Sequence, residues 1–357
     1  MLIGIVGAPS SGKSTFFAAA TMIDVARAAY PFTTIEPNKG VGFVRVECAD
    51  KDFNVQCNPR SGYCVNHIRF VPVELLDVAG LVPGAHEGKG LGNKFLDDLR
   101  QADVLIHVVD ASGSTNEKGE AVPAGSHDPS LNIRFLEEEL ELWMLGILVN
   151  NWGKFARQPL SGKQQVIDAL SKGLSGLGIN DKQVDAGLVR SKLVDKRLGD
   201  WSPEDQRSFV HSLRLISKPM VIAANKCDLP HAMENVERMR KEFPLLKIYP
   251  CSGEAELTLR KAAKAEMIEY VPGSPSFAMK KELNEAQGAG LRYIEQNVLQ
   301  KIGSTGIQEA LDHVVGESAA QCRGTHMGVG QFQPALLQGL FQCRRDTRHW
   351  QAGGGDE

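Results

Sequence analysis

The chain is predicted to be an α/β protein with a mostly parallel sheet, helices on both faces and a helical insertion. Short β-branched apolar runs alternate with helical stretches along its 357 residues, which is typical of a parallel sheet covered by helices. The string Gly7–Ser14 follows the first run and matches G-x-x-x-x-G-K-[ST], the phosphate-binding P-loop. The fourth run ends at residue 109 and the fifth begins at residue 220, too far apart for a single crossover. These features predict the G-domain fold of P-loop NTPases.

Six strands and three helix starts follow from local patterns. The expected strands, in chain order, are Leu2–Val6, Gly40–Glu47, Phe70–Leu76, Val104–Val109, Met220–Ala224 and Leu246–Tyr249. A helix is expected over Thr15–Ala20, directly after the P-loop. His127-Asp128-Pro129 predicts a second helix start, because Asp caps helices and Pro fits their first turn. Ser202-Pro203-Glu204-Asp205 predicts a third start of the capping-box type.

The same patterns divide the chain into regions. We expect a G domain over residues 1–114 and 218–290, a helical insertion over 115–217, and a C-terminal helix over 291–315. Residues 316–357 contain eight Gly and no Lys and are expected to be a poorly ordered tail. Within the insertion, the acidic run Glu137–Glu141 is either the solvated side of a helix or an interaction face.

Composition restricts the classes of protein that fit. Forty basic and 43 acidic side chains give a net charge of −3, so no bulk basic field is available for sequence-blind nucleic-acid binding. No apolar run approaches the roughly 18 to 20 residues that span a bilayer. The N-terminus lacks the basic region of a signal peptide, and seven cysteines suit reduced thiols better than a disulfide framework. We therefore expect a cytoplasmic protein without a membrane partner.

The P-loop predicts a phosphate and Mg²⁺ site. Its glycines let backbone N–H groups and a helix N-terminus face phosphate oxygens. Lys13 is expected to neutralise the β- and γ-phosphates, and the Ser14 hydroxyl to ligate Mg²⁺. The nucleotide contacts expected here are Gly7, Ala8, Pro9, Ser10, Ser11, Gly12, Lys13, Ser14 and Thr15.

Three later strings complete a guanine-nucleotide site. Asp77-Val78-Ala79-Gly80 ends a strand, so Asp77 can hold Mg²⁺ through water and the Gly80 N–H can sense a γ-phosphate. In Asn225-Lys226-Cys227-Asp228, the Asp228 carboxylate can accept from two guanine N–H groups that adenine lacks. Asn225 and Lys226 would hold the base edge and ring, and Ser252-Gly253 would supply a backbone N–H to the guanine oxygen. GTP is therefore the expected nucleotide.

With these motifs assembled, residues 1–315 resemble the Obg-related branch of translation-factor-class GTPases, above all its archaeal-type YchF-like members. Ala29–Asn38 and Asp77–Gly88 resemble the two switch segments of that family. The resemblance implies Mg²⁺-dependent GTP hydrolysis, a helical insertion in the G domain and a cytoplasmic role linked to ribosomes or translation. It also implies that Thr34, beside the similar hydroxyl of Thr33, closes on Mg²⁺ when a γ-phosphate is present, so Lys13, Thr34 and Gly80 are the expected catalytic groups.

The sequence departs from the family at several positions. Leu81 stands where Ras-like enzymes carry a water-orienting Gln, so we expect slow intrinsic turnover. Many relatives have Asn where this chain has Ser10, which argues against a potassium role, whereas Asp228 is intact and favours GTP over ATP. The TGS domain that follows the helices in the family is not recognisable after Val315. Two alternatives stay open: an ATPase of the same fold, and a GTP-liganded ribosome-binding module with negligible hydrolysis.

Cysteines and one loop offer further candidate sites. Cys48, Cys57 and Cys64, with His67, could ligate zinc or could be reduced thiols in a loop, because their spacing lacks a C-x-x-C knuckle. Cys227 is either an oxidisable group beside the nucleotide or a small buried side chain. His86 and Glu87 could assist water activation or be solvated loop residues.

Overall fold

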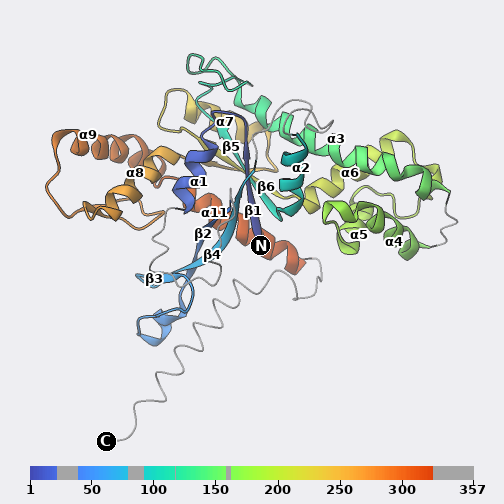
Figure 1. The fold of residues 1–357 in the computed structure, drawn as a ribbon, viewed down its shortest axis with the longest axis horizontal. Helices are drawn as coiled ribbons and strands as arrows, with labels where there is room; N and C mark the ends of the chain where they lie inside the picture. Colours follow the sequence, from blue (N-terminus) through green and yellow to red (C-terminus); the bar gives the residue numbers. More distant parts are fainter. Residues whose placement is uncertain (22–38, 79–91, 117, 158–161, 325–357) are drawn as a thin grey trace, which may run out of the picture.

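The computed structural model describes residues 1–357 except 22–38, 79–91, 117, 158–161 and 325–357. Its centre is a seven-stranded sheet in the order β2-β4-β1-β5-β6-β7, with β3 also paired to β4 (Figure 1). The strands are β1 (Leu2–Gly7), β2 (Lys39–Glu47), β3 (Tyr63–Val65), β4 (Ile68–Asp77), β5 (Val104–Asp110), β6 (Met220–Asn225) and β7 (Lys247–Pro250). The predicted α/β fold class is confirmed.

All six predicted strands are present, and their directions place the site. Strands β4, β1, β5, β6 and β7 are parallel, so their carboxyl ends meet at one edge of the sheet. Strand β2 runs antiparallel to β4. Strand β3 is not predicted from the sequence, because its three residues are too few to show an alternating pattern.

Alternate side chains of the buried strands belong to two apolar layers, one on each face of the sheet. On β5, Leu105 and Val109 belong to one layer, while Ile106 and Val108 belong to the other. The first layer includes side chains of α2 (Gly92–Gln101), α3 (Pro129–Ala156) and α7 (Ala232–Glu242), and the second includes α1 (Lys13–Thr21) and α11 (Ile307–Gly324). Helices therefore cover both faces, as predicted.

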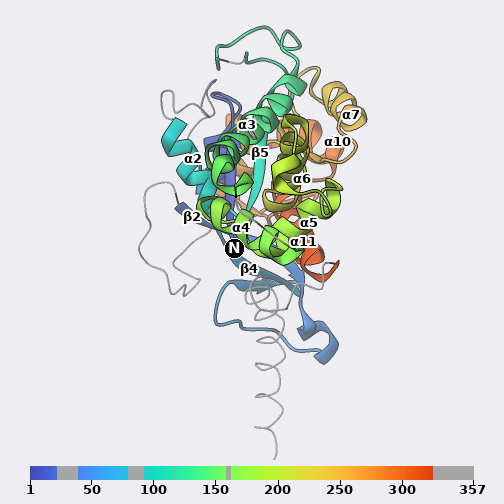
Figure 2. The ribbon, with the colours of Figure 1, turned by 90° about the vertical axis from the view of Figure 1, so that its right-hand side faces the viewer.

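The insertion is a helical bundle continuous with the first apolar layer. It contains α3, α4 (Lys163–Leu174), α5 (Asp181–Arg190) and α6 (Pro203–Ser217), which pack side by side (Figure 2). The two helix starts predicted within the insertion are confirmed: the Asp128 side chain accepts from the Ser130 N–H, and Ser202 forms a capping box with Asp205. Within the described residues, no helix is both long and apolar enough to cross a bilayer.

The chain after β7 returns to the sheet. Helices α8 (Gly253–Lys264), α9 (Glu285–Ile294) and α10 (Gln300–Ile302) surround a small apolar cluster beside a two-stranded sheet of β8 (Ile268–Glu269) and β9 (Ala278–Met279). Gly306, just before α11, has a φ of +76°, and a Cβ there would lie 1.9 Å from the Pro250 carbonyl oxygen. This glycine therefore lets the chain pass close to the end of β7 before α11 covers the sheet.

Candidate nucleotide-binding site

The P-loop joins the carboxyl end of β1 to the first turn of α1. Gly12 has a φ of +89°, and a Cβ at this position would lie 2.1 Å from Asn225 Nδ2. A Cβ on Gly7 would lie 2.6 Å from the Val108 carbonyl oxygen. Both positions therefore require glycine, and the loop wraps tightly at the start of α1, where backbone N–H groups are unpaired and favour anions.

Lys13 and Asp77 come together at this edge of the sheet. The Lys13 ammonium forms an ion pair with Asp77 Oδ1, and both side chains are largely buried. Ser14, in the first turn of α1, is exposed. The ammonium of Lys13, the carboxylate of Asp77 and the hydroxyl of Ser14, each predicted to be part of the site, thus lie beside the same loop.

Asn225 connects the P-loop to the predicted base-recognition strings. Its Nδ2 donates to the Ser11 carbonyl oxygen at 3.0 Å, and its Oδ1 accepts from the Gly253 N–H at 2.9 Å. The Ser252 hydroxyl donates to Asp228 Oδ1 at 2.9 Å. The side chain of Asn225 therefore holds the two loops in one arrangement, and Ser252 orients the carboxylate predicted to read the base.

Lys226 has a partner that the sequence alone does not predict. Its Nζ lies 2.8 Å from Asp110 Oδ2, at the end of β5, and Lys226 itself has a φ of +62°. Burial alone would raise the pKa of Asp110, but hydrogen bonds from Lys226, Ser112 and Thr115 hold this pKa below its ordinary value. A carboxylate directly after a buried strand, as at Asp77, was the pattern that could have identified it.

The loop after β5 lies against the P-loop. Ser10 has a φ of +59°, and its hydroxyl donates to the Gly119 carbonyl oxygen at 2.8 Å. Gly119 is so close that a Cβ there would lie 2.6 Å from Pro9 Cβ. Residues early in the predicted insertion therefore contact the site.

Cys227 lies inside the base-recognition string but away from solvent. Its side chain is 4% exposed, and burial, with the nearby Asp228, raises the pKa of the thiol to about 12. The thiol is thus protonated and poorly reactive at neutral pH, which favours the buried small side chain over the oxidisable group.

The switch residues lie outside the described part of the chain. Asp77 and Val78 end the described segment, and the predictions for Thr33, Thr34, Gly80, Leu81, His86 and Glu87 fall in undescribed ranges.

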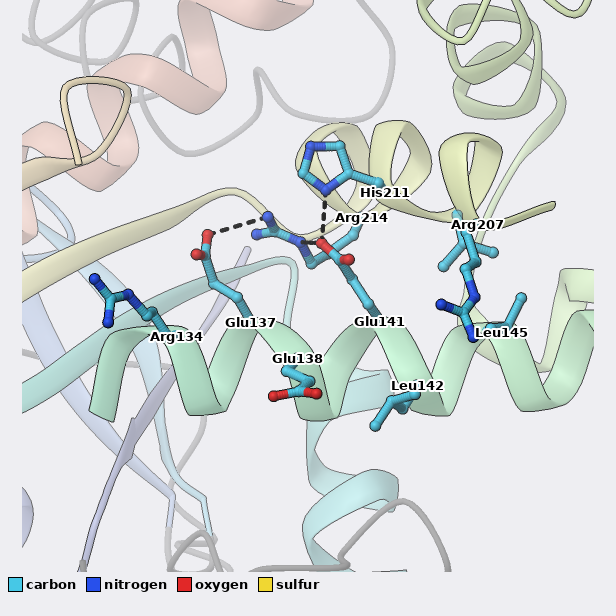
Figure 3. A pocket seen from close by; sticks show the side chains of 10 residues that line it. Arg134, Glu137, Glu138, Glu141, Leu142, Leu145, Arg207, His211 and Arg214 are labelled. Carbon is cyan, nitrogen blue, oxygen red and sulfur yellow. Dashed lines mark hydrogen bonds and ion pairs between the residues drawn. The ribbon is translucent and has the colours of Figure 1, made fainter. Parts of the chain in front are cut away.

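A second concave surface lies on the insertion, between α3 and α6, with a volume of about 470 Å³ (Figure 3). Arg214 is 3% exposed and pairs with Glu137 at 3.0 Å and Glu141 at 2.9 Å. His211 Nδ1 lies 2.8 Å from the same Glu141 carboxylate. Glu137 and Glu141 of the acidic run are therefore only partly exposed and form ion pairs between two helices.

The fold and the nucleotide site around the P-loop define a GTP-binding protein of the P-loop class. Two family profiles match the chain: "50S ribosome-binding GTPase" over residues 2–133, and "Obg-like GTPase YGR210-like, G4 motif-containing domain" over residues 223–321. The second range includes Asn225 and Asp228.

Individual relatives agree with the profiles. An uncharacterized GTP-binding protein of Methanocaldococcus jannaschii is 44% identical over 311 residues, covering 87% of this chain and 77% of the relative. The crystal structure of a GTP-binding protein from Pyrococcus horikoshii superposes with a TM-score of 0.68 at 36% identity, covering 88% of this chain and 78% of that one. The ribosome-binding ATPase YchF of Mycoplasma genitalium is 33% identical over 241 residues, covering 67% of this chain and 59% of the relative. The chain belongs to the Obg-like, YchF-related family of GTP-binding proteins.

Proposed function

We propose that this protein binds GTP with Mg²⁺ and hydrolyses it to GDP and phosphate, as a molecular switch that acts with the ribosome. The observation that carries the proposal is the bridge formed by Asn225 between the P-loop and the Ser252-Gly253 loop. A bridge of this kind holds a phosphate-binding loop and a guanine-reading carboxylate in a fixed relation before any ligand binds, which lowers the ordering cost of binding.

The described residues fit such a ligand. Gly7 and Gly12 allow the tight conformation of the phosphate-binding loop, because a Cβ at either position would clash with neighbouring atoms. Lys13 would exchange its ion pair with Asp77 for the phosphates, and Asp77 and the exposed Ser14 would then hold Mg²⁺, which prefers oxygen ligands. Bound Mg²⁺ would neutralise charge that develops on the phosphates. We assign the Mg²⁺ contact of Thr34 and the γ-phosphate contact of Gly80 by the family resemblance.

Nucleotide choice is tested with Asp228→Asn. The asparagine amide cannot accept from both guanine N–H groups, so GTP affinity should fall by about 10²-fold or more. Xanthosine triphosphate carries an oxygen where guanine carries its amino group, so it should bind the variant better than it binds the unaltered protein. Equilibrium binding of GTP, ATP and xanthosine triphosphate measures this. The control is Asp168→Asn, an exposed carboxylate on α4 that should leave all three affinities unchanged. Stronger binding of ATP than GTP by the unaltered protein would favour the ATPase alternative instead.

Hydrolysis is tested by single-turnover phosphate release with and without ribosomes. Because Leu81 cannot orient water by hydrogen bonding, we expect slow release from the protein alone and faster release with a partner. Rapid release without a partner would contradict this. Absence of release under both conditions would support a GTP-liganded binding module.

The ribosomal link rests on the family description "50S ribosome-binding GTPase" and on the name of the Mycoplasma relative, ribosome-binding ATPase YchF. Co-sedimentation with ribosomal subunits in GTP and in GDP tests it. A switch should sediment with one nucleotide and be released by the other.

A further inference from the structure

The segment between β2 and β4 buries unusual side chains. From residue 49 to residue 61, the buried side chains are Asp50 and Cys57, whereas Phe53 is 43% exposed and Val55 is 37% exposed. Apolar side chains normally fill the interior of a loop, and polar ones face water. Here the pattern is reversed, so something other than apolar packing holds this segment together.

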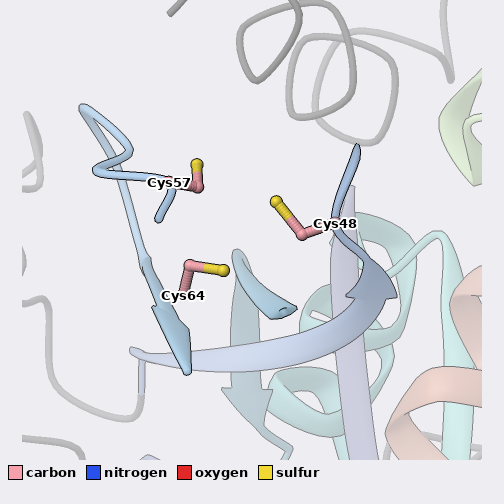
Figure 4. A group of neighbouring side chains, drawn as sticks. All are labelled: Cys48, Cys57 and Cys64. Atoms are coloured by element: carbon pink, nitrogen blue, oxygen red, sulfur yellow. The ribbon is translucent and has the colours of Figure 1, made fainter. Parts of the chain in front are cut away.

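Three thiols meet inside the segment. Cys48 follows β2, Cys57 lies in the loop and Cys64 lies in β3, and their Sγ atoms are all within 4.8 Å of one another (Figure 4). Zn–S bonds of about 2.3 Å in a tetrahedral site place sulfur atoms about 3.8 Å apart. Small side-chain rotations therefore suffice for all three sulfurs to reach one ion.

A buried cation faces the same cluster. Arg69, on β4, is 3% exposed, and its Nη1 donates to Cys57 Sγ at 3.6 Å. Its Nε is buried with no hydrogen-bond partner in the described part of the chain. A buried guanidinium is costly unless an anion lies nearby. Thiolates that bind a metal ion would supply that negative charge, whereas neutral thiols are weak acceptors.

A buried carboxylate organises the remaining polar groups. Asp50 is fully buried and accepts from the Cys57 N–H at 2.9 Å, and its other oxygen lies 3.0 Å from His67 Nδ1. Cys64 Sγ lies 3.5 Å from Asp50. Asn66 and His67 have φ values of +51° and +61°, which makes the β3–β4 connection a tight two-residue turn beside Cys64. A carboxylate that holds one nitrogen of a histidine and leaves the other for a metal is a common arrangement at zinc sites.

We propose that Cys48, Cys57 and Cys64 bind one zinc ion as thiolates, with His67 as the candidate fourth ligand. Thiolate and imidazole ligands in tetrahedral geometry suit zinc rather than magnesium or calcium. Arg69 balances part of the thiolate charge, and Asp50 positions His67 and the Cys57 backbone.

The position of the cluster defines its role as structural. On β4, Leu76 pairs with Lys39 near the nucleotide site, and Ile68 pairs with Glu47 at the opposite end. These pairs are roughly 26 Å apart at 3.3 Å per residue. The zinc ion would thus be remote from the phosphates. It would hold a loop whose own apolar cluster consists of little more than the cysteines themselves.

The test uses the full chain, purified with a thiol reductant and without chelator. We expect one zinc ion per chain by elemental analysis. After removal of zinc, addition of Co²⁺ should produce the intense sulfur-to-cobalt absorption of a thiolate site, and Zn²⁺ should abolish that absorption. Cys64→Ser should lose most of the zinc, and His67→Ala should weaken zinc affinity by about 10-fold or more, since loss of even an outer-shell partner costs that much. The matched control is Cys251→Ala, a buried cysteine beyond the end of β7, which should retain a full equivalent.

The cobalt spectrum of the unaltered protein keeps the proposal testable even if a cysteine variant does not fold. Absence of bound zinc together with absence of sulfur-to-cobalt absorption would overturn the proposal. A disulfide between two of the three cysteines in the purified, metal-free protein would overturn it too. Stoichiometric iron in place of zinc would also overturn it.

Discussion

Asn225 offers the sharpest test of the site, because one side chain satisfies two buried backbone groups. In Asn225→Ala, the Ser11 carbonyl and the Gly253 N–H both lose their partner. Each unsatisfied buried group costs about 1–3 kcal/mol, so the free energy of unfolding should fall by about 2–6 kcal/mol. Nucleotide affinity should fall as well, since the P-loop and the Ser252-Gly253 loop are no longer joined.

The assay is urea unfolding without nucleotide, because a bound ligand would add its own stabilisation. Asn235→Ala is the matched control: Asn235 is also buried, but its Nδ2 makes a single bond of 2.8 Å to the Ala111 carbonyl oxygen. We expect a loss of about 1–3 kcal/mol for this variant and little change in nucleotide affinity. If Asn225→Ala destabilised the protein no more than Asn235→Ala does, the bridging role would be refuted.

Two further predictions concern buried charged and titratable groups. Arg214→Ala should lower the free energy of unfolding by about 3 kcal/mol, because it leaves Glu137 and Glu141 without their shared cation. The control is Arg207→Ala, at the exposed rim of the concave surface between α3 and α6. It should change the free energy of unfolding by less than about 0.5 kcal/mol. Equal effects in thermal or urea unfolding would show that the ion pairs are unimportant. His107 is fully buried without a hydrogen-bond partner in the described part of the chain, and burial lowers its pKa to about 3. Unfolded His107 takes up a proton below pH 6.5 while the folded form does not, so stability is lost as pH falls, by about 2 kcal/mol at pH 5. His107→Leu should remove this part of the pH dependence, and an unchanged slope between pH 6.5 and pH 4 would contradict the assignment.

Much of the fold was predictable because it depends on local patterns. The six apolar runs, the Asp128 cap and the Ser202 capping box all appear where the sequence predicts them. Each depends on residues within a few positions of one another, where periodicity and capping chemistry act directly. Strand β3 escaped prediction because it is held by its pairing with β4 rather than by a pattern of its own.

The sequence motifs of the candidate site were predictable, but the contacts between their side chains were not. The P-loop and the Asn225–Asp228 string follow from spacing, since the chemistry of phosphate and guanine demands particular residues in order. That Lys226 pairs with Asp110, or that Ser10 contacts Gly119, depends on strands and loops more than a hundred residues apart. A local sequence pattern cannot predict contacts between residues that far apart along the chain.

The sequence by itself determined the class of nucleotide site and the positions of six strands along the chain. The P-loop requires glycine and lysine, and the base-recognition string requires asparagine and aspartate, at short fixed spacings, and each apolar run is visible locally. Only the tertiary structure decided which side chains satisfy one another. It joined the two nucleotide loops through Asn225. It also brought Cys48, Cys57 and Cys64 together, although their spacing resembles no standard zinc motif. The physical reason is that a buried polar group must find its partner wherever the packed strands place it, near or far along the chain.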